Sequence, residues 1–190
     1  MPDNVEAPVN KLDLKSLWEK TRPTVSLTIL CLIVCALLVG VYHLTYVDTT
    51  GVLTDKLRAG CESIFGEGEY EMLTSPVPEG VTSVIADRQN DTVTFEIYAN
   101  GYAKEGLHLL VGIDSNGAVA GVYVVSIAET PGLGTKVDNE SFLSQFKGQS
   151  DPALTVDAIT GATYSSKGVR NAVALALEAY QSEKEAIFGV

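Results

Sequence analysis

The sequence predicts an α+β protein, in which helices pack on a largely antiparallel sheet and one N-terminal transmembrane helix comes first. Three features carry this prediction: an uncharged apolar run at residues 23–47, four β-like runs within residues 81–128, and a long helical run that closes the chain. The β-like runs follow one another through short turn signals such as Asn100-Gly101. Consecutive strands joined by tight turns favour antiparallel pairing.

The apolar run is long enough to cross a bilayer. Between Arg22 and Asp48 lie 25 residues without Asp, Glu, Lys or Arg. About 24 helical residues rise roughly 36 Å, more than the hydrocarbon core requires. A cleaved signal peptide has a shorter apolar region, of about 7–15 residues, that ends in small residues. We therefore expect a retained single-pass anchor over residues 24–47.

Flanking charges predict the orientation of this anchor. Four basic residues closely precede it, whereas only two follow within twenty residues: Lys11, Lys15, Lys20 and Arg22 against Lys56 and Arg58. The positive-inside rule then keeps the N-terminal tail, residues 1–23, in the cytoplasm. Residues 48–190 are expected on the extracytoplasmic or periplasmic side of the cell (inner) membrane.

The predicted exported part is acidic. Residues 48–190 carry 9 Lys and Arg against 20 Asp and Glu, which accounts for the whole net charge of −11. Such a surface argues against nucleic acid as a partner and against docking on anionic lipid. Solubility alone is a sufficient reason for the charge.

Periodicity gives the order of elements after the anchor. Residues 54–65 have helical spacing, and Gly66 ends them, so residues 48–80 are expected to form a juxtamembrane helix or stalk and a connector with one short strand. A sheet domain is expected over residues 81–190. Its strands are predicted at residues 81–87, 92–99, 101–113 and 119–128.

The last third of the chain is expected to contain a short helix at 139–146, a final strand at 155–159 and a closing helix at 164–186. The closing helix has apolar residues at helical spacing. They predict a buried face formed by Val169, Val173, Ala176, Leu177 and Tyr180.

Residues 157–166 form the most informative segment of the chain. A small, flexible turn, Thr160-Gly161-Ala162-Thr163, directly precedes the closing helix. Backbone N–H groups and the positive end of a helix would face a hydroxyl there, an arrangement suited to a phosphate. For the tetrapeptide taken alone, a plain turn with Ser165 or Ser166 as helix cap is the favoured explanation.

Two separated motifs resemble the FMN-binding domain family. Asp157 to Thr163 resembles the Asp-x-x-Ser/Thr-Gly-Ala-Thr flavinylation signature, and Glu129 to Gly134 matches the Glu-Thr-Pro-Gly-Leu-Gly motif of one branch. The resemblance makes residues 81–190 an FMN-binding domain. It implies FMN attached covalently through a phosphoester to Thr163, by a separate flavin transferase. Gly161 and Ala162 would leave room for the phosphate.

The resemblance also suggests roles for neighbouring residues. Donors in the first helical turn would face the phosphate: Ser165, Ser166 and Lys167. Thr160 would hydrogen-bond the phosphate or simply stabilise the turn. The second motif would lie near the isoalloxazine ring, with Glu129, Thr130, Leu133 and Gly134. Asp157 either orients the turn or places the metal of the transferase; a buried carboxylate at a strand end is an equal alternative. Lys167 is alternatively a solvated surface charge.

By this resemblance the chain is an electron carrier whose flavin performs the redox chemistry. Its length and single anchor favour the G subunits of Rnf-type complexes over the usually longer C subunits of sodium-pumping NADH:quinone reductases. Such a complex couples ferredoxin:NAD electron transfer to sodium or proton translocation, so the partners are its other membrane subunits. No metal site and no catalytic side chain are expected in this chain.

Two alternatives remain from the sequence. The first is a flavinylated relay or sensor of another extracytoplasmic redox system. The second is an anchored binding or structural domain without a cofactor.

Overall fold

The computed structural model describes residues 14–45, 52–74 and 77–188 of the 190-residue chain. The chain divides into two compact units, Met1–Asp48 and Thr49–Val190. Residues 1–13 of the predicted tail lie outside the described residues. So do residues 46 and 47, the last two of the predicted anchor.

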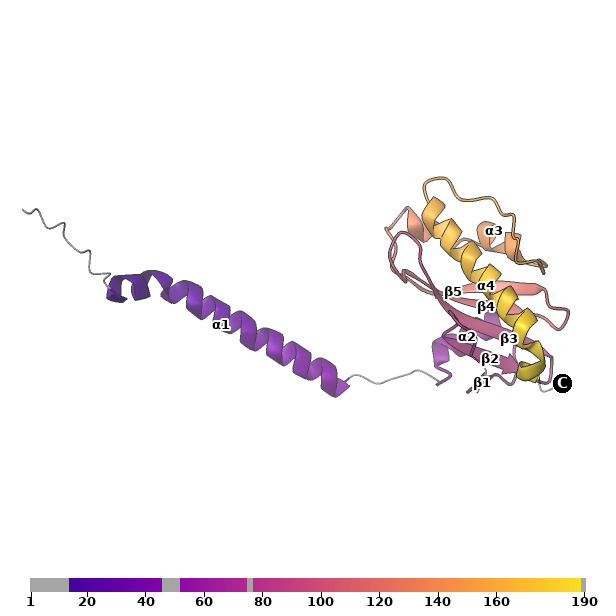
Figure 1. The fold of residues 1–190 in the computed structure, drawn as a ribbon, viewed down its shortest axis with the longest axis horizontal. Helices are drawn as coiled ribbons and strands as arrows, with labels where there is room; N and C mark the ends of the chain where they lie inside the picture. Colours follow the sequence, from indigo (N-terminus) through magenta and orange to yellow (C-terminus); the bar gives the residue numbers. More distant parts are fainter. Residues whose placement is uncertain (1–13, 46–51, 75–76, 189–190) are drawn as a thin grey trace, which may run out of the picture. The chain divides into compact units, whose positions relative to one another are not determined.

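The described part of the first unit is α1, Leu14–Thr45 (Figure 1). Its portion Thr21–Thr45 is long and apolar enough to cross a membrane. Leucines such as Leu37 and Leu38 are exposed in this portion, at 64% and 65%. A helix that exposes apolar side chains all round is suited to a lipid environment.

The second unit contains a five-stranded sheet with the strand order β1-β2-β3-β4-β5 (Figure 1). Every neighbouring pair is antiparallel. The strands are β1 Glu71–Leu73, β2 Ser83–Asp87, β3 Thr92–Ala99, β4 Leu107–Ile113 and β5 Val119–Ile127. The predicted α+β class, with its antiparallel sheet and N-terminal apolar helix, is confirmed.

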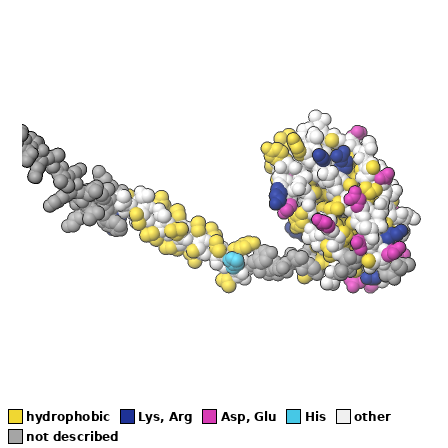
Figure 2. All heavy atoms as spheres, viewed as in Figure 1, with side chains coloured by type: hydrophobic (Ala, Val, Ile, Leu, Met, Phe, Trp, Pro, Cys, Tyr) yellow, Lys and Arg dark blue, Asp and Glu magenta, His cyan; other side chains and the backbone are white. Residues whose placement is uncertain are grey.

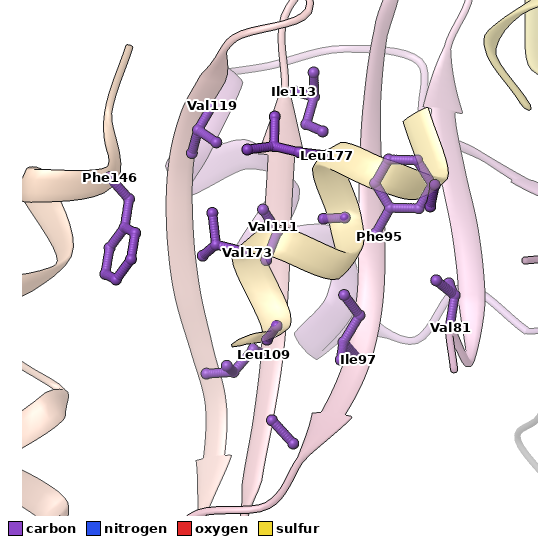
Figure 3. Close-up of a cluster of buried hydrophobic side chains, with 14 of the residues drawn as sticks. Val81, Phe95, Ile97, Leu109, Val111, Ile113, Val119, Phe146, Val173 and Leu177 are labelled. Atoms are coloured by element: carbon purple, nitrogen blue, oxygen red, sulfur yellow. The ribbon is translucent and has the colours of Figure 1, made fainter. Parts of the chain in front are cut away.

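The closing helix, α4, spans Thr163–Phe188 and covers one face of the sheet (Figure 1). All five residues of its predicted apolar face are buried. Figure 3 shows Val173 and Leu177 of this helix among Phe95, Val111 and other side chains of the sheet. This packing holds the first turn of α4 at one end of the sheet.

The helix α2, Asp55–Phe65, packs on the opposite face. Leu110 lies between Leu109 and Val111 in β4, so its side chain points away from α4 and contacts the cluster around Leu57 and Cys61. The helix predicted as a juxtamembrane element is thus packed into the unit Thr49–Val190 and is not a free stalk. Burial raises the pKa of the Cys61 thiol to about 11.

Between β5 and α4 the chain forms three short helices. They are η1 Gly134–Val137, α3 Glu140–Leu143 and η2 Ser144–Phe146. The side chain of Asn139 accepts a hydrogen bond from the backbone N–H of Ser141 at 2.9 Å and so caps α3. Figure 3 shows Phe146 beside Val119, where it closes the side of the core.

Two strand predictions need correction. Residues 155–159 do not form a strand; the backbone N–H of Asp157 instead donates to the Gln145 side-chain oxygen at 2.8 Å. A side chain thus supplies the partner that a neighbouring strand would have provided. The strand predicted from residue 101 begins only at Leu107, because residues 101–106 form a turn.

Gly168 sets how closely α4 approaches the end of β3. A Cβ atom at this position would lie 2.5 Å from the carbonyl oxygen of Asn100 and 2.8 Å from Leu107 Cδ1. Ala is the better helix former by about 1 kcal/mol, but the backbone of Asn100 leaves no room for it. We expect Gly168→Ala to lower the free energy of unfolding by about 1–3 kcal/mol, measured by chemical denaturation. The control is Ser182→Ala, near the far end of α4; an equally stable Gly168→Ala variant would contradict the close approach.

Candidate functional site

The turn before α4 places a threonine hydroxyl at the surface. Gly161 has a φ of +83°, a left-handed conformation that favours glycine. The backbone N–H of Ala162 donates to the carbonyl oxygen of Ile159 at 2.9 Å, which closes the turn. Thr163 follows as the first residue of α4, and it is exposed. Its hydroxyl is therefore open to a reacting group.

A buried carboxylate connects this turn to two other segments. Glu129, after the end of β5, is only 8% exposed. Its Oε2 accepts hydrogen bonds from the Ser165 hydroxyl at 2.9 Å and from the backbone N–H of Tyr102 at 3.2 Å. Its Oε1 accepts from the backbone N–H of Ala103 at 3.1 Å. One side chain thus joins the turn after β3, the loop after β5 and the start of α4.

Three glycines make room for this carboxylate: Gly101, Gly106 and Gly134. A Cβ atom at Gly134 would lie 2.6 Å from Glu129 Oε2 and 2.8 Å from Ser165 Oγ. A Cβ atom at Gly106 would lie 2.6 Å from Glu129 Oε1. Any side chain at these positions would push the carboxylate from its donors, so the motif glycine Gly134 serves close packing.

The two sequence motifs surround one cavity of about 360 Å³. This volume is within the range of about 300–1,000 Å³ usual for small-molecule sites. The lining consists of both motif loops and one residue from the turn after β3: Glu129, Thr130, Leu133, Gly134, Gly161, Ala162, Thr163, Tyr164, Ser165 and Tyr102.

Exposed apolar side chains form the rim of this cavity. The rings of Tyr102 and Tyr164 meet edge to face, with centroids 6.2 Å apart, and both side chains are largely exposed. Leu133 is 48% exposed beside them. Figure 2 shows a hydrophobic patch near the start of α4, on the upper left of the domain. A flat aromatic ligand would find apolar contacts at this rim and polar groups deeper in the cavity.

A second, smaller cavity of about 130 Å³ lies on the other side of Thr163. Two cationic residues, Lys167 and Arg170, line it together with Val156, Ala158, Thr163 and Ser166. Thr163 is the one residue that lines both cavities among the described parts of the chain.

Some predicted site residues have internal roles in the structure. Ser165 and Ser166 are buried, and the Ser166 hydroxyl oxygen accepts a hydrogen bond from the backbone N–H of Ile159 at 3.1 Å. Asp157 is exposed and does not lie in a strand, so the alternative of a buried carboxylate at a strand end is wrong. Thr160 lines neither cavity, and the side chain of Lys167 is exposed.

Five residues that line these cavities were not predicted from the sequence: Tyr102, Val156, Ala158, Tyr164 and Arg170. Arg170 had a usable signal, because Thr163, Lys167 and Arg170 are spaced as neighbours on one helix face. Tyr164 directly follows the attachment motif. Nothing in the sequence around Tyr102 indicates that its turn folds back against Glu129.

Another cavity, of about 570 Å³, includes no motif residue and lies on the α2 side of the sheet. Glu96 is buried there and accepts hydrogen bonds from the Ser83 hydroxyl and from His108, whose Nε2 is 2.7 Å from Glu96 Oε1. Tyr98 stacks on His108, with ring centroids 4.1 Å apart. Burial raises the pKa of the Glu96 carboxyl, but the hydrogen bonds from His108 and Ser83 and the charge of His108 outweigh it, so this pKa lies below its ordinary value.

Comparison with known proteins identifies a family that resembles this part of the chain. Residues 101–178 match the FMN-binding domain family. Thr163 lines two cavities, and all of their lining residues fall within this range; the first of them in sequence is Tyr102 and the last is Arg170.

Curated relatives belong to ion-translocating oxidoreductases. The chain is 36% identical over 104 residues to the G subunit of the proton-translocating ferredoxin:NAD(+) oxidoreductase complex of Clostridium ljungdahlii, covering 49% of this chain and 56% of the relative. It is 32% identical over 96 residues to the G subunit of the Na(+)-translocating ferredoxin:NAD(+) oxidoreductase complex of Acetobacterium woodii, covering 44% and 45%.

A third relative matches over most of its length. The G subunit of the ion-translocating oxidoreductase complex of Methanosarcina acetivorans is 28% identical over 183 residues, covering 88% of this chain and 97% of the relative. The match thus spans about half the length of the first two relatives and nearly all of the third. The chain is therefore similar to these G subunits, and the region that matches the FMN-binding domain family carries both motifs.

Glu129 should be important for stability. Glu129→Ala would leave the buried Ser165 hydroxyl and the N–H groups of Tyr102 and Ala103 without their acceptor. We expect the free energy of unfolding to fall by about 2–4 kcal/mol in chemical denaturation, because each lost partner costs roughly 1–3 kcal/mol. Amide hydrogen exchange should speed up at Tyr102 and Ala103. Exposed Glu178→Gln is the control, and unchanged stability of Glu129→Ala would contradict the role of the carboxylate.

Glu96 should make stability depend on pH in the acid range. A carboxyl whose folded pKa is depressed stabilises the fold above its unfolded pKa, and this contribution is lost as pH falls through the folded value. Glu96→Gln should therefore be less stable than wild type at about pH 5.5, and the difference should shrink on going to about pH 3. Chemical denaturation at each pH measures it. A difference that stays constant over this range would refute the assignment.

Proposed function

We propose that this chain is a membrane-anchored electron carrier, with FMN joined through a phosphoester to Thr163, in an Rnf-type complex that couples ferredoxin:NAD electron transfer to sodium or proton translocation. The observation that carries the proposal is the position of Thr163. Its exposed side chain lies between a cavity with an aromatic rim and a smaller cavity with two cations, inside the region that matches the FMN-binding domain family.

The residues around the larger cavity suit a flavin ring. Tyr102, Leu133 and Tyr164 offer flat apolar contacts, while the loop at residues 129–134 offers backbone groups that can bond to the polar edge of the ring. Glu129 holds this loop in place through its three hydrogen bonds, which engage both of its carboxylate oxygens. We therefore assign Glu129 a positioning role.

Covalent attachment requires an accessible hydroxyl and a separate transferase. The new bond would join Thr163 Oγ1 to the flavin-bearing phosphorus of a flavin dinucleotide. The phosphoanhydride bond to its other phosphate would break, the nucleoside monophosphate would leave as an anion, and the threonine proton would pass to solvent through a base of the transferase. The left-handed Gly161 and small Ala162 keep bulky side chains away from this hydroxyl. Asp157 and Thr160 are exposed in the segment just before Thr163, so the transferase would be able to contact them. The bound flavin would supply the electron-transfer chemistry.

The predicted anchor is not suited to conduct the translocated ion. Residues 23–47 contain no Asp, Glu, Lys or Arg, so this segment offers no charged path for an ion. Ion movement would then belong to other membrane subunits. The flanking basic residues favour an N-terminus in the cytoplasm and a flavin domain on the extracytoplasmic side.

The test is the mass and fluorescence of the full chain produced in a host with the flavin transferase. Attachment of one FMN with loss of water adds about 438 Da, and the protein band should show flavin fluorescence. Thr163→Ala should lose both. Thr160→Ala changes a threonine of the same turn that lines neither cavity, so it should keep both.

Wild-type protein without flavin in a competent host would overturn the assignment of Thr163. A flavinylated chain that does not co-purify with other membrane subunits of its cell would instead favour a relay of another redox system.

A further inference from the structure

We propose that Lys167 and Arg170 form a phosphate subsite in the smaller cavity beside Thr163. This subsite is separate from the ring cavity, as we call the 360 Å³ cavity proposed to hold the flavin ring. This inference rests on the proposed function, because it assigns the anionic part of the same flavin nucleotide. Arg170 is the new element: it lies outside both sequence motifs, seven residues after the attachment threonine.

Geometry separates the two subsites. Thr163 lines both cavities, so a group attached to its hydroxyl can contact either one. The larger cavity has Tyr102 and Tyr164 at its rim and no Lys or Arg among its lining residues. The smaller cavity has Lys167 and Arg170, which lie four and seven residues after Thr163 and therefore on the same face of α4. The apolar ring would thus contact the tyrosines of the larger cavity, and the anionic phosphate would contact the cations of the smaller one.

The charges of this cavity are opposite to those of the domain. Residues 48–190 have 20 acidic and 9 basic residues, yet no carboxylate lines the smaller cavity. Within the described parts of the chain neither Lys167 nor Arg170 takes part in an ion pair. Two unpaired cations beside one another repel, and a phosphate between them would remove this cost. Figure 2 shows Lys and Arg side chains close to the hydrophobic patch near the start of α4.

The neighbouring hydroxyl groups are already engaged in the protein. Ser165 donates to Glu129, and the Ser166 oxygen accepts from the backbone N–H of Ile159. Both serines are 2% exposed. The two cationic side chains are therefore the groups best placed to bind phosphate oxygens, and a guanidinium can do so through two parallel hydrogen bonds.

The test compares FMN with riboflavin, which has the same ring but no phosphate. The full chain is produced in a host that lacks the transferase, and reversible binding of each flavin is measured by fluorescence titration at low salt. FMN should bind at least about tenfold more tightly than riboflavin, because charge-assisted hydrogen bonds form only with the phosphate. The preference should weaken as salt is added.

Variants locate the source of the preference. K167Q/R170Q should remove most of the preference for FMN and leave riboflavin binding unchanged, which also shows that the variant is folded. R170K keeps the charge and should retain part of the preference. The matched control is K184Q, which removes a cation from the far end of the same helix.

The outcomes separate the two proposals. Equal binding of FMN and riboflavin to wild type, or a full preference for FMN in K167Q/R170Q, would overturn the phosphate subsite while leaving the ring cavity intact. Absence of binding by both flavins would contradict the ring cavity itself, and the subsite would fall with it.

Discussion

The site depends on one buried carboxylate and its three hydrogen bonds. Glu129 connects Tyr102 and Ala103, 27 and 26 residues earlier, with Ser165, 36 residues later. A buried carboxylate without donors would be strongly unfavourable, so the three segments are held together wherever this side chain is enclosed. The aromatic rim and the attachment turn then take fixed positions beside it. Side chains in place of the surrounding glycines would break the same arrangement by steric conflict.

The remainder of the domain serves as a rigid support for this connection. α4 buries one face against the sheet, while α2 covers the opposite face, so the sheet has a core on both sides. Burial of Val173 and Leu177 fixes the axis of α4, and the absence of a side chain at Gly168 lets its first turns approach Asn100. The threonine at the start of this helix is consequently exposed yet well positioned. Such an arrangement is suited to a tethered cofactor, which must keep its orientation during electron transfer.

Charge and apolar surface are divided around Thr163. The ring cavity has tyrosine and leucine at its rim, whereas cations line the smaller cavity. A strongly acidic domain would repel a phosphate over most of its surface, so a local pair of cations gives an anionic ligand one preferred place. The 570 Å³ cavity around Glu96 and His108 has a buried polar network of its own and includes no residue of either motif.

Local signals along the chain were enough to predict most of the elements. The uncharged run at 23–47 is recognised by its length and composition. The alternation in β3 and the apolar face of α4 follow from spacing, because hydrophobic burial imposes a period on neighbouring residues. The two motifs can also be read directly from the sequence. Folding of the whole domain was needed to bring both motifs and Tyr102 around one cavity and to enclose Glu129 among its donors. It also brings Gln145 to Asp157, whose backbone N–H donates to the Gln145 side-chain oxygen in place of a strand partner. These contacts join residues far apart in sequence, and their geometry depends on the packing of all the elements, which no local pattern contains.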